Sequence, residues 1–230
     1  MTRHTHGFTL LEMAIVLVIV ALLLGSGLSL VSVQIEQQHI KDTQKTLEDA
    51  KEALIGYALI NGRLPCPAAP ATTGVENPLG GGACTNFNNG FLPAITLGLP
   101  GTDSAGYLVD AWGYRIRYAV TAANTNAVTT TNGLKNLPMA SFTPNLYVCS
   151  TSTGTTPTTC GTATAYTASA VAVLVSTGKN PANINPDEAA NQNANPVFVS
   201  HSLTATFDDQ LTWLPASTLF NRMVQAGTLP

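Results

Sequence analysis

The chain has 230 residues, of which 45% are hydrophobic and only 10% charged, and its formal net charge is -3. A charged share well below the usual value of about 25% excludes the highly charged, weakly hydrophobic kind of disordered chain. The ten Lys and Arg residues are spread along the chain and form no basic stripe. Binding to a nucleic-acid backbone is therefore not expected. The length suits one domain with an appended segment.

Residues 8–33 form an apolar segment in which Glu12 is the only ionisable side chain. As a helix this segment would reach about 39 Å, whereas the hydrocarbon of a bilayer is about 30 Å thick. The residues before it carry Arg3 and no acid, which favours a cytoplasmic N-terminus. We therefore expect residues 8–33 to form one membrane-spanning helix, with the rest of the chain across the membrane.

A cleaved secretory signal is the alternative interpretation of this segment. The unbroken apolar run from Met13 to Leu24 and the small residues of Gly25-Ser26-Gly27 fit such a signal. Two features favour a retained helix instead. Hydrophobic residues resume at Leu28, and Glu12 stands at the front of the apolar run, where a signal peptide gains nothing from an acid.

An amphipathic helical pattern continues over residues 34–62. Apolar residues recur every seven positions at Val33, Ile40, Leu47 and Leu54. A companion row of smaller or amphipathic side chains repeats at the same interval, at Thr43, Ala50 and Tyr57. Asn61-Gly62 and then Pro65 predict the end of the helix. The pattern predicts one helix from Phe8 to about Ile60. The alternative is two helices with a break near Gly25 and Gly27, because glycine weakens a helix interior.

Residues 63–230 read as a globular head with its own core. Turn-forming clusters separate five short strand-like runs: Tyr114–Thr121, Leu146–Ser150, Ala170–Thr177, Val197–Ser200 and Leu211–Leu214. Alternation in the first run places Arg115 and Arg117 on one face. Residues 217–226 have the apolar spacing of a closing helix. The predicted fold class is α+β, with the polar half of the long helix packed on an antiparallel sheet.

The N-terminal sequence carries a resemblance to a known family. Gly7-Phe8-Thr9-Leu10-Leu11-Glu12, followed directly by Met13-Ala14-Ile15-Val16, resembles the processing and assembly signature of the type IV pilin superfamily, which includes the pseudopilins of type II secretion. The resemblance implies that a prepilin peptidase cuts after Gly7, removes the leader of residues 1–7 and methylates Phe8. It also implies that Glu12 neutralises the N-terminal amine of a neighbouring subunit during assembly.

A second segment adds to the resemblance. Asp110-Ala111-Trp112-Gly113 is similar to the Asp-Pro-Trp-Gly turn of major pseudopilins, with Ala111 in place of the proline. The implied protein is a single-pass inner-membrane subunit with a cytoplasmic N-terminus and a periplasmic head. It would polymerise with itself and with other pilins or pseudopilins, on an inner-membrane assembly platform, into a pilus that drives type II secretion. One alternative is a type IV pilin or minor pilin of a surface fibre. Another is a monomeric periplasmic binding module held by a signal anchor.

Four cysteines follow the apolar segment, and none belongs to a Cys-x-x-Cys pair: Cys66, Cys84, Cys149 and Cys160. Beyond the leader only His39 and His201 remain as histidines, so a zinc site is not expected. The compartment across an inner membrane is oxidising, which favours disulfides. Of the three pairings that four cysteines allow, we favour Cys66 with Cys84 and Cys149 with Cys160, because each closes a local loop. Such loops contribute about 3 kcal/mol each on a chain-entropy view.

The resemblance also implies one metal site. Major pseudopilins often hold a calcium ion in a late loop of the head, and four acids here are candidate oxygen ligands for it: Asp187, Glu188, Asp208 and Asp209.

No catalytic motif is complete. Ser104 misses the Gly-x-Ser-x-Gly spacing by one residue, and Gly80-Gly81-Gly82 lacks the lysine of a phosphate-binding loop. We therefore do not expect enzyme activity.

Overall fold

A computed structural model of the chain describes residues 7–71, 73–182 and 185–229, apart from the side chains of residues 23–32. The chain divides into two compact units, Met1–Lys41 and Asp42–Pro230. Of the predicted leader, residues 1–6 lie outside the described residues. The predicted boundaries at residues 33 and 62 remain predictions, because the division at Lys41 does not test them.

The first element is α1, an α-helix of 52 residues over Leu10–Asn61. Its backbone is helical at Gly25 and Gly27. The segment therefore forms one helix and not the two helices that the sequence left as an alternative. Gly62 ends it with a positive φ of 63°, and its N–H donates to the carbonyl of Ala58 over 2.8 Å. A left-handed residue of this kind is a common helix stop, and glycine adopts it without steric cost.

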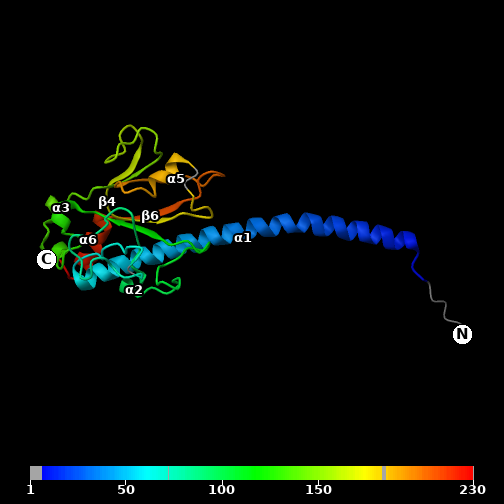
Figure 1. Cartoon of the computed structure of the whole chain (residues 1–230), viewed down its shortest axis with the longest axis horizontal. Coiled ribbons are helices and arrows are strands. Elements are labelled where there is room, and N and C mark those ends of the chain that lie inside the picture. Colours follow the sequence, from blue (N-terminus) through cyan, green and yellow to red (C-terminus); the bar gives the residue numbers. More distant parts are fainter. Residues whose placement is uncertain (1–6, 72, 183–184, 230) are drawn as a thin grey trace. The chain divides into compact units, whose positions relative to one another are not determined.

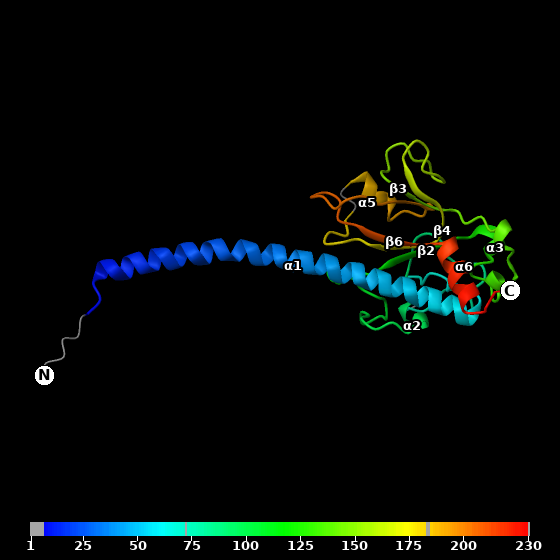
Figure 2. The same ribbon diagram turned by 180° about the vertical axis from the view of Figure 1, so that it is seen from behind.

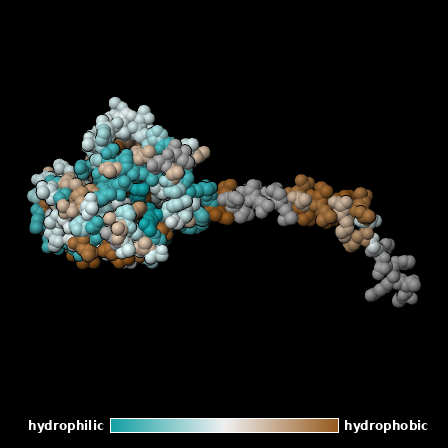
Figure 3. Space-filling view, viewed as in Figure 1, coloured by the Kyte–Doolittle hydropathy of each residue, from teal (hydrophilic) through white to brown (hydrophobic). Residues whose placement is uncertain are grey.

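In the N-terminal unit, the apolar side chains of residues 10–22 of α1 are exposed. Figure 3 shows hydrophobic surface along these helical residues. Leu10 is 90% exposed and Leu17 68%, although both are fully apolar. Within the described residues, no helix has the combination of length and apolar character that a bilayer crossing requires.

The head is built on a six-stranded sheet. Its strands are β1 (Gly90–Phe91), β2 (Arg117–Val120), β3 (Leu146–Cys149), β4 (Ala165–Ser176), β5 (Val197–Val199) and β6 (Gln210–Pro215). The order is β1-β2-β4-β3-β5, with β6 also on β4. The 12-residue β4 is central because its first half pairs with β3 and its second half pairs with β2 and β6.

The predicted α+β class is confirmed, with one correction to the sheet. Most neighbours are antiparallel, but β3 pairs with β5 in parallel, so that Val148 lies opposite Phe198. The sheet is therefore mixed, whereas an antiparallel sheet was expected. A parallel pair needs a long connection between its strands. Residues 150–196 provide it, and they include β4 itself.

The core of the head forms between the sheet and the part of α1 that follows Asp42. Leu47, Ala50 and Leu54 from the predicted helical stripe are buried against sheet residues such as Tyr118 and Leu174. Figures 1 and 2 both show β4 and β6 on one side of this part of α1 and the short α2 (Ala94–Leu97) on the other. The helical face that the sequence marked as apolar is therefore the face that packs on the sheet.

The remaining helices are short, except the closing one. They are α3 (Ala123–Asn126), α4 (Gly133–Asn136), a 3-10 turn (Met139–Ser141), α5 (Pro186–Ala190) and α6 (Ala216–Gln225). The last agrees with the closing helix predicted over residues 217–226. It buries Leu219, Phe220 and Met223 in the core.

The Asp110-Ala111-Trp112-Gly113 segment forms a tight turn that leads toward β2. One oxygen of Asp110, Oδ1, accepts the backbone N–H groups of Trp112 (3.0 Å) and Tyr114 (2.8 Å). Its other oxygen, Oδ2, accepts the hydroxyl of Ser176 at 2.6 Å. Gly113 has a φ of 87°, a value that glycine adopts readily. Trp112 is half-buried. The turn is thus a structural element held by one carboxylate.

Candidate functional site

The N-terminal site consists of Gly7, Phe8 and the first turn of α1. Thr9 and Glu12 form a reciprocal pair: the backbone N–H and the hydroxyl of Thr9 both donate to Glu12 Oε2 over 2.9 Å, and the N–H of Glu12 donates to Thr9 Oγ1 over 3.2 Å. This arrangement is a capping box, which satisfies N–H groups that the first helical turn leaves open. It orients Glu12 beside the start of the helix.

The other carboxylate oxygen, Oε1 of Glu12, accepts no hydrogen bond from the residues that the structure describes. Phe8, four residues before Glu12 in the sequence, is 78% exposed. The Glu12 carboxylate therefore keeps acceptor capacity for a cation from outside the chain while one of its oxygens stays bound locally.

Gly7 is exposed and its position is open. A Cβ atom built on it would meet no other atom within 4 Å, and its φ lies outside the left-handed region that favours glycine. Neither packing nor backbone conformation therefore requires a glycine here. A requirement for glycine at this position must come from a partner that reads the segment.

Comparison with known families identifies this segment. Residues 2–28 match the prokaryotic N-terminal methylation motif. This motif is the prepilin-cleavage signature of type IV pilins and pseudopilins, so the recognition made from residues 7–16 is confirmed. It supports a type IV pilin-like substrate of prepilin peptidase and implies, in general terms, pilin polymerisation and a membrane-anchored precursor. No curated protein and no solved structure matches the chain.

Both predicted disulfides are present in the head. Cys66 and Cys84 join the segment that follows α1 to the next loop, with their Cα atoms 5.3 Å apart. Cys149 and Cys160 close the threonine-rich loop that follows β3, with Cα atoms 5.6 Å apart. The local pairing expected from loop length is therefore the pairing in the structure.

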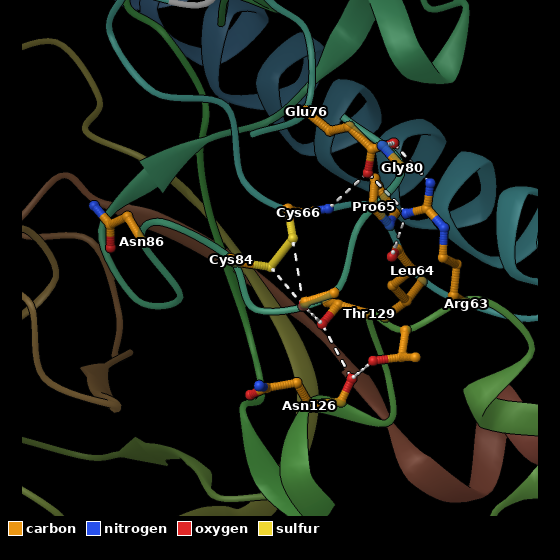
Figure 4. The surroundings of a disulfide bond; sticks show 12 residues. Arg63, Leu64, Pro65, Cys66, Glu76, Gly80, Cys84, Asn86, Asn126 and Thr129 are labelled. Atoms are coloured by element: carbon orange, nitrogen blue, oxygen red, sulfur yellow. Dashed lines mark hydrogen bonds and ion pairs between the residues drawn. A yellow bond between two sulfur atoms is a disulfide. The ribbon is translucent and has the colours of Figure 1, made fainter. Parts of the chain in front are cut away.

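A buried ion pair, which the sequence did not reveal, lies beside the first disulfide (Figure 4). Arg63 donates from Nη1 and Nη2 to the two oxygens of Glu76, each over 2.7 Å. Glu76 also accepts the N–H groups of Cys66 (3.1 Å) and Gly80 (3.2 Å). Burial alone would raise the pKa of Glu76, but these hydrogen bonds and the guanidinium charge lower it. The pair ties the helix exit to the loop of the disulfide.

Three of the four predicted calcium ligands come together. One carboxylate oxygen from each of Glu188, Asp208 and Asp209 lies within 4.8 Å of the others. Glu188 is fully buried on α5 and Asp209, which precedes β6, is only 2% exposed. The two segments meet although 20 residues separate Glu188 from Asp208, whose N–H donates to Glu188 Oε1 over 3.2 Å.

The electrostatics of this acidic cluster fit a cation. Burial, together with the charges of Glu188 and Asp208, raises the pKa of Asp209 to about 7, although a hydrogen bond from Asn191 opposes the shift. Burial also raises the pKa of Asp208. The Oδ1 atoms of Asp208 and Asp209 are buried and accept no hydrogen bond among the described residues. Hard cations such as calcium are bound by carboxylate and carbonyl oxygens of this kind.

Asp187, the fourth predicted ligand, is not part of this cluster. Its Oδ1 accepts the N–H of Ser152 at 2.6 Å, and its Oδ2 lies 3.1 Å from Nε2 of His201. Burial acts to raise the pKa of Asp187, but hydrogen bonds from Ser152, His201 and Thr151 lower it. As the residue next to Glu188 on a helix, Asp187 points in another direction, so adjacency in the sequence overstated the ligand set.

Proposed function

We propose that the chain is a structural subunit that polymerises through its N-terminal helix, as a pseudopilin of a type II secretion system. The observation that carries the proposal is the methylation motif at residues 2–28. By the resemblance, Gly7, Phe8 and Glu12 would be the cleavage, methylation and assembly positions of this motif. Before assembly, residues 8–33 would hold the chain in the inner membrane, with the head in the periplasm. The proposal assigns the chain no catalytic activity.

The physics of Glu12 supports the assembly role. A carboxylate inside a bilayer costs a few kcal/mol. An ion pair at 4 Å in an effective dielectric of 20 returns about 4 kcal/mol. The two contributions nearly cancel, so pairing with the cationic amine of a neighbouring Phe8 mainly removes a penalty. Its remaining effect is to select one axial register between adjacent helices, which is the best-attested use of a buried charge.

The exposed apolar side chains of α1 support the same role. Burying one large apolar side chain contributes about 1.5–3 kcal/mol. Leu10, Leu17 and Leu22 are each more than two-thirds exposed within the N-terminal unit. A surface of this kind needs lipid or other helices to cover it. In the proposed filament, sister helices would cover it.

The proposal is tested first at the N-terminus. Mass spectrometry of the purified protein should find a chain that begins at a methylated Phe8. Replacing Gly7→Val should stop cleavage without changing the thermal melting of the head, because the position is open in the fold. An intact Met1 in the wild-type protein would overturn the proposal.

Assembly is tested by cross-linking between N-terminal helices in living cells. Glu12→Ala should abolish the cross-linked ladder, whereas Glu36→Ala, an acid outside the apolar segment of the same helix, should leave it intact. Solitary wild-type copies would favour the monomeric, signal-anchored alternative. A deletion strain that lacks surface fibres but secretes normally would favour a type IV pilin or minor pilin.

We further propose that the head binds a divalent cation of the calcium type at Glu188, Asp208 and Asp209. Three converging carboxylates support this assignment, and two of them, Asp208 and Asp209, each have a buried oxygen that accepts no hydrogen bond among the described residues. The cation would neutralise acids that otherwise repel each other and would join α5 to the segment before β6. Loss of a calcium-dependent rise in melting temperature on Asp209→Asn tests the assignment. Calcium that leaves the melting of the wild-type protein unchanged contradicts it.

A further inference from the structure

Two arginines line one cleft of the head: Arg117 begins β2, and Arg115 lies two residues before it. Arg115 and Arg117 alternate with the buried Ile116 and Tyr118, so both guanidinium groups lie on the same outer face. The cleft has a volume of about 330 Å³, and Phe91 and Tyr114 contribute aromatic walls to it. Its size is at the lower end of the range found for small-molecule sites.

Arg115 is held rigidly but keeps donors available. Its Nε donates to Asp103 Oδ2 over 2.7 Å, and its guanidinium lies 4.1 Å from the ring centre of Tyr107. Its two terminal nitrogens donate to no acceptor in the part of the chain that the structure describes. The guanidinium is thus oriented by two contacts, and its terminal N–H groups remain for a ligand.

Arg117 is a half-buried cation that donates to no carboxylate among the described residues. Its Nη1 donates to the amide oxygen of Asn89 and its Nη2 to that of Gln192 over 3.3 Å, and both acceptors are neutral. Burial lowers the pKa of Arg117, while the charge of Asp209 opposes the shift. An arginine nevertheless stays charged in proteins. Only neutral groups accept hydrogen bonds from this half-buried guanidinium, so a bound anion would add a charge-assisted hydrogen bond that it lacks.

Phe91 connects the two arginines. Its ring centre lies 5.8 Å from the guanidinium carbon of Arg115 and 5.7 Å from that of Arg117. Two arginines and one aspartate, Asp103, line the cleft, which leaves one net positive charge at its surface. A bound anion would therefore meet two guanidinium groups and a flat apolar ring together.

We propose that this cleft binds a small organic carboxylate whose charged group lies against Arg115 and Arg117 and whose flat body packs on Phe91 and Tyr114. Guanidinium groups recognise planar carboxylates through paired hydrogen bonds, and an aromatic wall favours a ring or another flat body. The ligand class goes beyond the structural role proposed above, because assembly through the N-terminal helix does not need the cleft.

The test uses the full-length protein in detergent and titrates it with benzoate, followed by calorimetry. Benzamide, which has nearly the same shape and no charge, is the matched ligand control. We expect millimolar or tighter binding of benzoate and at least tenfold weaker binding of benzamide. Equal binding of the two ligands, or no binding of benzoate, overturns the proposal.

Arg115→Gln is the protein variant for this test, because its side chain is 34% exposed and its loss should leave the head folded. It should weaken benzoate binding at least tenfold. Arg222→Gln removes an exposed arginine on α6 that pairs with Glu52, and it should bind benzoate as the wild type does. Unchanged binding by Arg115→Gln overturns the proposal. If that variant melts without cooperativity, the comparison of benzoate with benzamide on the native protein decides alone.

Discussion

Replacing Asp209→Asn should stabilise the head at alkaline pH when no divalent cation is present. Burial, together with the charges of Glu188 and Asp208, raises the pKa of Asp209 to about 7, whereas the ordinary value of an aspartate is 3.8. Above pH 7 the folded protein must keep this carboxylate charged in a buried, acidic environment. Asparagine has nearly the same shape and carries no charge, so the substitution removes this cost.

The magnitude follows from the difference between the two pKa values. The shift from 3.8 to about 7 is roughly 3 units, and each unit corresponds to 1.36 kcal/mol, so the cost above pH 7 is on the order of 4 kcal/mol. Because the folded-state pKa is raised, the stabilising contribution is complete below pH 3.8 and is lost as the pH rises to about 7. Between pH 8 and pH 5 this group alone should add about 3 kcal/mol to the free energy of unfolding.

The measurement is urea unfolding of the full-length protein in detergent and EDTA, followed through the fluorescence of Trp112 and Trp213. The free energy of unfolding of Asp209→Asn should exceed that of the wild type at pH 8 and should converge toward it at pH 5. Asp187→Asn is the matched control, because the pKa of Asp187 is lowered and its removal should instead destabilise the head throughout this pH range.

Calcium should narrow the difference at Asp209 at pH 8. At a concentration one hundred times its dissociation constant, a ligand adds about 2.7 kcal/mol to the stability of the wild type. The Asp209→Asn variant should gain far less, because it lacks one ligand charge. A difference between wild type and variant that does not change from pH 8 to pH 5 would refute the electrostatic reasoning.

Two further predictions concern the exit of the long helix. Replacing Cys66→Ser together with Cys84→Ser should lower the free energy of unfolding by about 3 kcal/mol, measured by urea unfolding under oxidising conditions; an unchanged midpoint would contradict a stabilising role for this disulfide. Replacing Arg63→Met should cost about 3–5 kcal/mol, because it leaves Glu76 charged and buried, and adding Glu76→Gln should recover much of that loss. Arg222→Met, which breaks an exposed pair, should cost less than about 1 kcal/mol, and a similar loss in both arginine variants would argue against the burial effect.

The sequence by itself determined the features whose physical cause is local. Hydrophobic spacing at three and four residues identified α1 and its buried face at Leu47 and Leu54, because helix formation and amphipathicity depend on near neighbours. The motif that contains Gly7, Phe8 and Glu12 was recognised because it is one continuous segment. Its recognition does not depend on how the head folds. The two cysteine pairs were also predicted from local information, because each pair closes a short loop of the chain.

The tertiary structure alone decided which distant residues meet. Nothing in local spacing shows that β5 joins β3 in parallel, that Arg63 lies against Glu76, or that Gln192 reaches Arg117. The strand pairing depends on the long β4, whose first half pairs with β3 and whose second half pairs with β2 and β6. The predicted ligand set shows the same limit, since Asp187 and Glu188 are adjacent in the chain but face different partners.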